Sequence, residues 1–144
     1  MPDPVIFNRQ RRYAVPLSKL RRFLVRLGSR LKIPEREFVV LLTNDRTMRK
    51  LNHRFRNKDR ATDVLSFPSS ASLQQEPSFE TSYLGDIIIS VERARRQAIE
   101  RKHNLEKELR ILMIHGVLHL LGHDHETDQG QMRRKELRLQ RELL

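Results

Sequence analysis

The sequence predicts an α+β fold in which one small mixed sheet of four strands packs against about five helices. Short apolar stretches, some of which contain β-branched residues, alternate with longer stretches whose leucines recur at helical spacing. The order of these stretches does not require an all-parallel sheet. With 144 residues the chain is long enough for one hydrophobic core, so we expect residues 1–144 to form a single domain.

The four strands are expected where short apolar runs end at turn-forming residues. They cover residues 5–7, 38–42, 62–67 and 84–90. The third run ends at Pro68, which favours an edge strand because proline lacks the backbone donor that a central strand needs. The segment 69–82 is rich in Ser, Gln and Glu and is expected to be a loop.

Five helices are expected from leucine periodicity and from residues that cap helix ends. They cover residues 16–33, 44–56, 91–103 and 104–121, and a charged C-terminal stretch after residue 128. Asn44 or Asp45, Ser90 and Asn104 stand at three of the expected N-termini, where short polar side chains accept hydrogen bonds from free backbone amides.

The first helix carries a basic stripe beside its leucine stripe. Lys19, Arg22, Arg26 and Arg30 recur at three- and four-residue steps, which places them on one face. Such a face either guides a polyanion or is simply solvated, and the pattern alone favours neither. Arg22, Arg26 and Arg30 are therefore candidate substrate-binding residues.

The positive charge is concentrated in the first part of the chain. The formal net charge is +11, and residues 1–60 contain 17 Lys and Arg against 5 Asp and Glu. The rest of the chain contains 12 basic and 13 acidic residues. An excess of this kind attracts phosphate polymers irrespective of sequence, so the charge favours a nucleic-acid partner over solubility alone or an acidic membrane surface.

Four of the six histidines fall in one short stretch. His115 and His119 are four residues apart, so a helix places both imidazoles on one face. Their neighbours are apolar on nearly every side, which predicts a buried helix and histidines in a low dielectric. Gly122 is expected to end the helix, after which His123 or His125 reaches the same point. This spacing is typical of a three-histidine zinc site, whereas hydrogen-bonded core histidines rarely cluster in this way.

Three neutral histidines leave the fourth position of a zinc ion open, as in catalytic rather than structural sites. Such an ion lowers the pKa of bound water to about 7, so hydrolysis is the expected reaction. Metalloproteases carry a glutamate base directly after the first histidine, and here that position is Gly116. Asp124 and Asp86 are the available substitutes, although no spacing rule supports either.

Four stretches, the first two of which in chain order form one central block, together carry a family resemblance. The histidine stretch reads His-Gly-x-Leu-His-Leu-x-Gly-x-Asp-His over 115–125. It is preceded by Asn-His-Arg-Phe-Arg at 52–56, Thr-Asp-Val-Leu-Ser-Phe-Pro at 62–68 and Leu-Gly-Asp-Ile-Ile-Ile-Ser at 84–90. In this order they resemble the YbeY family of bacterial zinc-dependent endoribonucleases, which act in rRNA maturation.

The resemblance implies a zincin-like arrangement, with the metal helix against the sheet and one zinc ion per chain. By position its ligands would be His115, His119 and His125. Arg56 matches an arginine that the family places near the metal, and it is expected to hold a phosphate through its planar fork. Lys58 is a neighbouring basic residue that would guide the RNA backbone.

Two acidic residues are candidates for orienting the metal ligands. Asp86 lies inside an expected buried strand, where a carboxylate is costly unless it is paired. It would accept a hydrogen bond from the ring N–H of a ligand histidine, as carboxylates do around many metal sites. Asp124, beside the last histidines of the stretch, is the second candidate for this role.

The expected function is therefore that of a zinc-dependent hydrolase of RNA, with single-strand preference and a ribosomal RNA target implied by the resemblance. Aromatic residues are scarce in this chain. Proteins that bind single-stranded RNA often stack the bases on aromatic rings, so we expect only a weak preference for the RNA sequence. Two alternatives stay open, namely a metalloprotease-like zinc hydrolase and a non-enzymatic RNA-binding module with structural zinc. The module would need a fourth protein ligand, such as His123 or Asp124.

The surroundings of the protein are also predicted. The chain has no cysteine, no apolar run as long as a membrane span and no signal-peptide pattern at its N-terminus. We therefore expect a cytoplasmic protein without a membrane partner, whose partners are ribosomal RNA and ribosomal particles.

Overall fold

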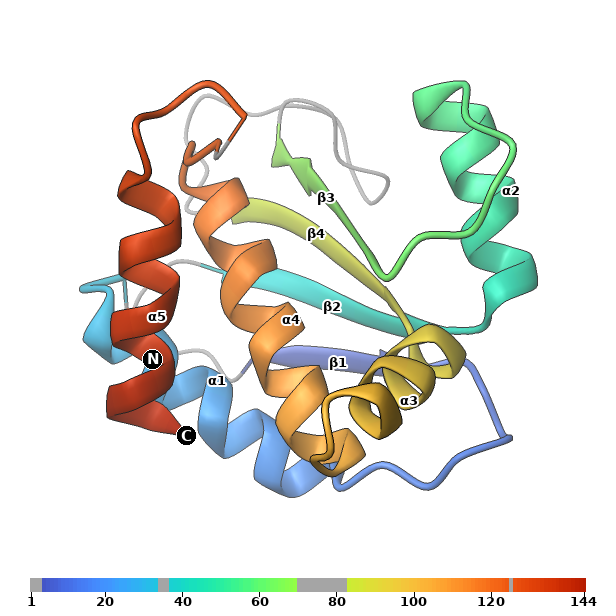
Figure 1. Cartoon of the computed structure of the whole chain (residues 1–144), viewed down its shortest axis with the longest axis horizontal. Helices are drawn as coiled ribbons and strands as arrows, with labels where there is room; N and C mark the ends of the chain where they lie inside the picture. The colour runs from blue at the N-terminus through green and yellow to red at the C-terminus, as the bar shows by residue number, and fades with distance from the viewer. Residues whose placement is uncertain (1–3, 34–36, 70–82, 125) are drawn as a thin grey trace.

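Four strands form one mixed sheet in the order β1-β2-β4-β3 in the computed structural model, which describes residues 4–33, 37–69, 83–124 and 126–144 (Figure 1). The strands are β1 (Val5–Asn8), β2 (Glu37–Thr43), β3 (Val64–Pro68) and β4 (Tyr83–Ser90). β1, β2 and β4 are parallel, whereas β3 runs antiparallel to β4 at the sheet edge, as predicted. From residue 70 onward, the expected loop lies outside the described residues.

The described residues form five helices, which confirms the predicted α+β class. The helices are α1 (Leu17–Arg30), α2 (Asp45–Arg56), α3 (Val91–Glu100), α4 (Leu105–Leu120) and α5 (Gln131–Leu143). Asn44, Ser90 and Asn104 cap α2, α3 and α4, each accepting a hydrogen bond from a backbone amide of the first turn. In the part of the chain that is described, we find no helix both long and apolar enough to cross a membrane.

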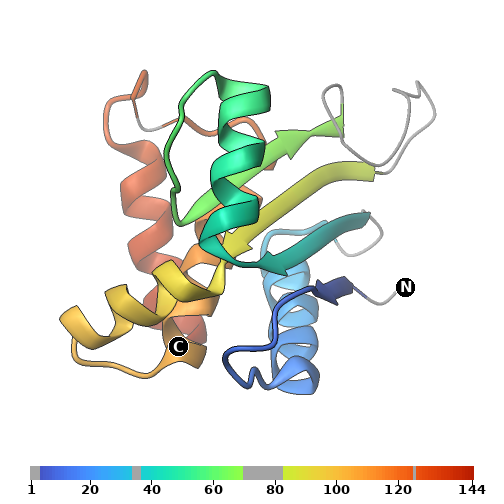
Figure 2. The ribbon, with the colours of Figure 1, turned by 90° about the vertical axis from the view of Figure 1, so that its right-hand side faces the viewer.

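The helices divide unequally between the two faces of the sheet. α4 crosses one face with α1 and α5 beside it, and their apolar side chains form the main core (Figure 1). On the other face, α2 contributes Met48 and Leu51 to a smaller cluster over β3 and β4 (Figure 2). α2, β3 and the C-terminal half of α4 thus come together around one edge of the sheet.

Gly85 allows β3, β4 and α4 to approach closely. Its φ of 142° is one that side-chain-bearing residues rarely adopt, and a Cβ there would lie 2.1 Å from the carbonyl oxygen of Phe67. The same Cβ would lie 2.9 Å from a methyl group of Leu120. The pairing of β4 with β2 also shifts here, from Glu37–Tyr83 to Phe38–Gly85. This bulge changes which residues of β4 face α4.

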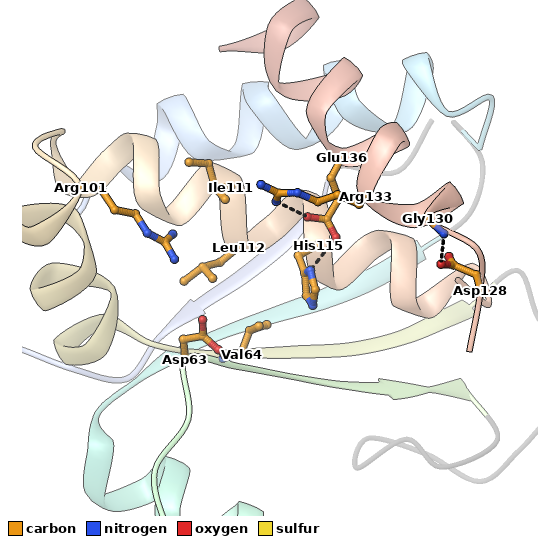
Figure 3. A pocket seen from close by; sticks show the side chains of 10 residues that line it. All are labelled: Asp63, Val64, Arg101, Ile111, Leu112, His115, Asp128, Gly130, Arg133 and Glu136. Atoms are coloured by element: carbon orange, nitrogen blue, oxygen red, sulfur yellow. Dashed lines mark hydrogen bonds and ion pairs between the residues drawn. The ribbon is translucent and has the colours of Figure 1, made fainter. Parts of the chain in front are cut away.

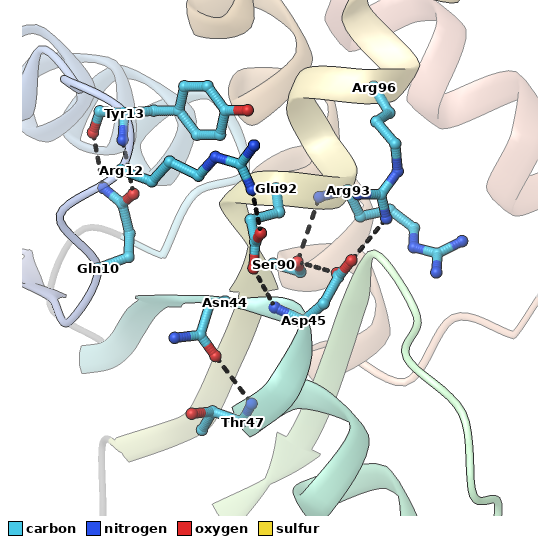
Figure 4. A network of polar contacts seen from close by, with 10 residues as sticks. All are labelled: Gln10, Arg12, Tyr13, Asn44, Asp45, Thr47, Ser90, Glu92, Arg93 and Arg96. Atoms are coloured by element: carbon cyan, nitrogen blue, oxygen red, sulfur yellow. Dashed lines mark hydrogen bonds and ion pairs between the residues drawn. The ribbon is translucent and has the colours of Figure 1, made fainter.

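A polar network joins the start of α2 to the start of α3 (Figure 4). Ser90 donates to Oδ1 of Asp45 at 2.5 Å, and Arg96 donates to Oδ2 at 2.6 Å. The backbone amide of Asp45 donates to Glu92, which also pairs with Arg12. Partial burial alone would raise the pKa of Asp45, but the hydrogen bonds from Ser90 and Arg96 outweigh it and lower this pKa below its ordinary value.

We predict that Asp45→Asn destabilises the protein by about 1–2 kcal/mol at neutral pH, because charge-assisted hydrogen bonds to a partly exposed carboxylate are lost. The folded-state pKa of Asp45 is depressed, so its contribution is complete above the unfolded-state value and falls as pH drops through the folded-state value. Urea unfolding of wild type and variant at pH 6.5 and pH 3 should therefore give free energies that differ at the higher pH and converge at the lower.

Glu100→Gln is the matched control, since Glu100 is exposed on α3 and has no ion pair among the described residues. It should match the wild type in the same titration. An Asp45→Asn protein as stable as wild type at pH 6.5, or a difference that persists at pH 3, would contradict this account of the network.

Candidate metal centre and catalytic cleft

His115 and His119 bring their ring nitrogens together on α4. The two Nε2 atoms are 3.1 Å apart, and the ring centroids are 4.6 Å apart. Two imidazoles bound to one zinc ion at about 2.0–2.1 Å in tetrahedral geometry have their nitrogens roughly 3.3 Å apart. Because the observed spacing is close to this value, the pair fits a chelating position for a divalent metal.

The histidine face of α4 is more open than the sequence predicts. Between Leu112 and Leu120 the other residues of α4 are buried, but His115 and His119 are only partly buried, and the relative exposure of the His115 side chain is 26%. The expectation that both lie in a low dielectric is therefore wrong. α4 is covered by the sheet and by neighbouring helices on its apolar sides, while the histidines line a cleft.

α4 ends as the sequence predicts. Gly122 takes a φ of 95°, its amide donates to the carbonyl of His119, and the amide of His123 donates to the carbonyl of Leu118, both at 3.0 Å. These two bonds make up a Schellman motif, which requires a residue in the left-handed region at its centre. The motif reverses the chain directly after the second histidine.

The residues after this turn are described in part. The carboxylate of Asp124 accepts from the amide of Glu126, so it stabilises the turn, and both residues line the cleft. His125 lies outside the described residues, so its predicted ligand role stays a prediction. Among the described residues, no group of three or more potential metal ligands comes together. His123 does not line the cleft.

Glu136 is the functional residue that sequence reasoning missed. Its Oε1 atom lies 2.7 Å from Nδ1 of His115, and it is buried at the interface of α5 with α4 (Figure 3). A carboxylate on Nδ1 orients the ring so that Nε2 is the nitrogen directed toward a metal, a common arrangement around metal sites. The signal was available, because Glu136 interrupts the apolar stripe of α5 formed by Met132 and Leu139.

Asp86 lies away from the two histidines of α4. Its strand partner is Phe67, and it shares a sheet face with Ile88, which packs under α2. That face is opposite α4, and there Asp86 accepts a hydrogen bond from the hydroxyl of Tyr83. The carboxylate on His115 comes from α5 and not from Asp86, and a role of Asp86 toward another ligand histidine stays a prediction.

Arg56 lies at the cleft, as predicted. The cleft has a volume of about 270 Å³ and is lined by Arg56, Ser66, both α4 histidines and residues of the following turn. The Arg56 guanidinium donates to the carbonyl of Ser66 at 2.9 Å and lies over the ring of Phe67. These contacts hold the cation at the end of α2 beside the histidine pair. Lys58 lines an adjoining hollow, which also includes Arg56.

The basic stripe on α1 lies away from the cleft, and the substrate-binding role predicted for it stays a prediction. Arg26 donates to the carbonyl of Leu143, and Arg30 pairs with Glu142, both at 2.7 Å, while Arg22 is exposed. α1 packs beside β1, which forms the sheet edge opposite β3. Since neighbouring strands lie about 4.8 Å apart, the width of the sheet separates this stripe from the metal centre.

Gly116 is required by packing. A Cβ at this position would lie 2.8 Å from Cγ2 of Ile87 on β4, which is closer than real Cβ contacts allow. A side chain here would point into the sheet and away from the cleft. The glutamate base of a metalloprotease therefore has no room at this position, which disfavours the protease alternative.

Comparison with known proteins agrees with the arrangement around α4. The family model described as endoribonuclease YbeY matches residues 6–144. The chain belongs to the endoribonuclease YbeY family. This membership, with the cleft beside Arg56, supports a nuclease that acts on RNA.

Individual relatives of the YbeY family match most of the chain. Endoribonuclease YbeY of Nautilia profundicola is 47% identical over 72% of this chain and 70% of its own length. That of Solibacter usitatus is 54% identical over 70% of this chain, which spans 62% of that relative. The solution structure of TM1509 from Thermotoga maritima is similar in fold, with a TM-score of 0.65, 29% identity, and coverage of 97% of this chain and 87% of that one.

We predict that Glu136→Ala weakens zinc binding by about 10- to 100-fold, because His115 loses the carboxylate that orients its ring. Competition with a chromophoric chelator measures this affinity directly, without reference to activity. Glu142→Ala is the matched control on the same helix, where the carboxylate pairs with Arg30 far from the histidines. A folded Glu136→Ala protein with wild-type zinc affinity would rule out the proposed orienting contact.

Proposed function

We propose that this protein is a zinc-dependent, single-strand-preferring endoribonuclease that acts in maturation of the 3′ end of 16S rRNA on ribosomal particles in the cytoplasm. The observation that carries the proposal is the close pairing of the His115 and His119 Nε2 atoms beside the Arg56 guanidinium. Family membership supports the endoribonuclease class. The rRNA target and the single-strand preference rest on the family resemblance.

The ligands proposed for one zinc ion are His115, His119 and His125. The first two have a spacing that fits the ion, and the third follows the Gly122 turn at the position that the resemblance indicates. When bound with an open fourth position, zinc supplies Lewis-acid chemistry and lowers the pKa of water there to about 7. Glu136 keeps Nδ1 of His115 engaged, so Nε2 is the nitrogen presented to the ion.

Arg56 is proposed to stabilise the negative charge that builds on the phosphate oxygens in the transition state. Its guanidinium has five N–H donors, and the carbonyl of Ser66 uses one of its nitrogens. The remaining donors can bind a phosphate in the cleft. Because Ser66 and Phe67 already hold the cation in place, little reorganisation is needed when charge develops.

The alternative of an RNA-binding module with structural zinc would require a fourth protein ligand. Of the two residues considered for this role, His123 does not line the cleft and the Asp124 carboxylate accepts a hydrogen bond from the turn that follows α4. Among the described residues, these observations favour an open metal position and therefore the catalytic proposal.

The test is cleavage of an end-labelled single-stranded RNA by zinc-loaded protein, with His119→Ala purified identically beside it. We expect cleavage by wild type only, because the variant loses one member of the chelating pair. Arg56→Gln should lower kcat by about 100- to 1,000-fold with its zinc content unchanged. Arg54→Gln, which removes an exposed cation from the same helix, should cleave like wild type.

Equal cleavage by wild type and His119→Ala would indicate a contaminating ribonuclease and contradict the proposal. No cleavage by either protein despite bound zinc would favour a structural-zinc module or an enzyme that needs the ribosome. The product ends identify the nucleophile, since a 2′,3′-cyclic phosphate would show attack by the ribose 2′-OH in the first step.

A further inference from the structure

A second hollow adjoins the cleft and is strongly basic. It has a volume of about 370 Å³ and lies between the loop after α2 and the outer side of α3. Its charged lining consists of four cations, Arg56, Lys58, Arg60 and Arg93, and one carboxylate, Asp63. We call this feature the basic hollow. Arg56 lines both the basic hollow and the cleft, so the two are neighbours on either side of its side chain.

The loop that carries Lys58 and Arg60 is held in a defined shape. Asn57 takes a left-handed conformation with a φ of 56°, which ends α2 and turns the chain. Asn52 is 3% exposed, and its side-chain amide donates to the carbonyl of Arg60 at 2.9 Å. The amide of Arg60 donates to the carbonyl of Lys58 at 2.9 Å. The two cations are therefore presented by an ordered loop, which lowers the entropic cost of binding an anion.

Nearby carboxylates compensate these cations only in part, since Asp63 is the one carboxylate of the lining and the charge of Arg93 helps to lower the pKa of Asp45. Asp59 is bound by Arg49 through two hydrogen bonds of 2.8 and 3.1 Å. Asp63 accepts from its neighbours in the loop and from the side chain of Gln97. Among the described residues, Lys58, Arg60 and Arg93 have no ion pair. A concave surface with several unpaired cations attracts and concentrates anions.

Arg93 lines the basic hollow and has a side-chain donor without a hydrogen-bond partner among the described residues. Its backbone amide bonds to Ser90, but Figure 4 shows the guanidinium directed away from the Asp45 network. Its Nε atom is shielded from solvent and has no hydrogen-bond partner among the described residues. A shielded donor without a partner costs free energy, and no protein acceptor at Nε holds the Arg93 guanidinium in place.

We propose that the basic hollow binds a phosphate of the RNA backbone that flanks the phosphate in the cleft, with Lys58, Arg60 and Arg93 as its cations. Arg56 lies between the two phosphates. The RNA strand then runs from the histidine pair past the end of α2 toward α3, and away from α1. This proposal rests on the proposed function for the identity of the polymer, and it adds the path of the strand and the roles of Arg60 and Arg93.

The test measures binding of a 12-nucleotide, fully 2′-O-methylated RNA to zinc-loaded protein by fluorescence anisotropy over a range of salt concentrations. The logarithm of affinity falls with the logarithm of salt by about 0.7 for each phosphate contact to a single strand. We expect Arg93→Gln to reduce this slope by about 0.7 and to weaken binding roughly 3- to 10-fold at low salt. The double variant Lys58→Gln/Arg60→Gln should reduce the slope at least as much.

Two further variants keep the test specific. Lys19→Gln removes an exposed positive charge from α1 and should leave the slope unchanged. Arg93→Lys restores the charge and should recover most of the slope, which a purely structural role would not predict. An unchanged slope for Arg93→Gln, or an equal fall for Lys19→Gln, would overturn the proposal.

RNA cleavage by wild type and the salt slope of Arg93→Gln together distinguish a failure of the phosphate site from a failure of the catalytic proposal. If wild-type protein does not cleave RNA but Arg93→Gln lowers the salt slope, the phosphate site stands and the catalytic proposal fails. If wild type cleaves RNA in the presence of zinc and the slope of Arg93→Gln is unchanged, the catalytic proposal stands and the phosphate site fails.

Discussion

The close approach of α4 to β4 is the constraint on which the rest of the site depends. Gly116 has no side chain, so the backbone of α4 lies directly against Ile87, and Gly85 lets β3 and β4 meet near Leu120. With the helix held this close to the sheet, His115 and His119 emerge at the sheet edge beside β3. A larger residue at position 116 would lift the helix and separate the histidines from the arginine that faces them.

The centre is assembled from segments that lie far apart in the sequence. α4 supplies the histidine pair, α5 supplies the carboxylate of Glu136, and the end of α2 supplies Arg56. The exposed edge strand β3 links them, since the carbonyl of Ser66 accepts from Arg56 and its hydroxyl donates to the carbonyl of Gly116. The result is a chelating pair bordered by cations on the α2 side, an arrangement suited to a polyanion that must reach a metal.

The parts predicted from sequence are those set by local rules. Four-residue spacing places His115 and His119 on one face, and a glycine in the left-handed region ends α4 at Gly122. The edge position of β3 follows from its terminal proline. Each of these depends on the backbone geometry of a few neighbouring residues, so the chain within one element contains the necessary information.

The parts that were missed depend on tertiary packing. The bulge before Asp86 changes the face on which it lies; Gly85 is a residue typical of a bulge, but the register with β2 that fixes the face forms only in the folded sheet. The side chains of Arg26 and Arg30 reach the end of α5, a contact that appears only when both helices dock. Glu136 was visible as an acid within an apolar stripe, but its partner His115 could be identified only from the packed structure.

X-ray absorption at the zinc edge of the zinc-loaded protein tests the central claim, a catalytic zinc centre, most directly. The account predicts three imidazole nitrogens and one oxygen donor that is not from the protein, whereas four protein donors would contradict a catalytic centre.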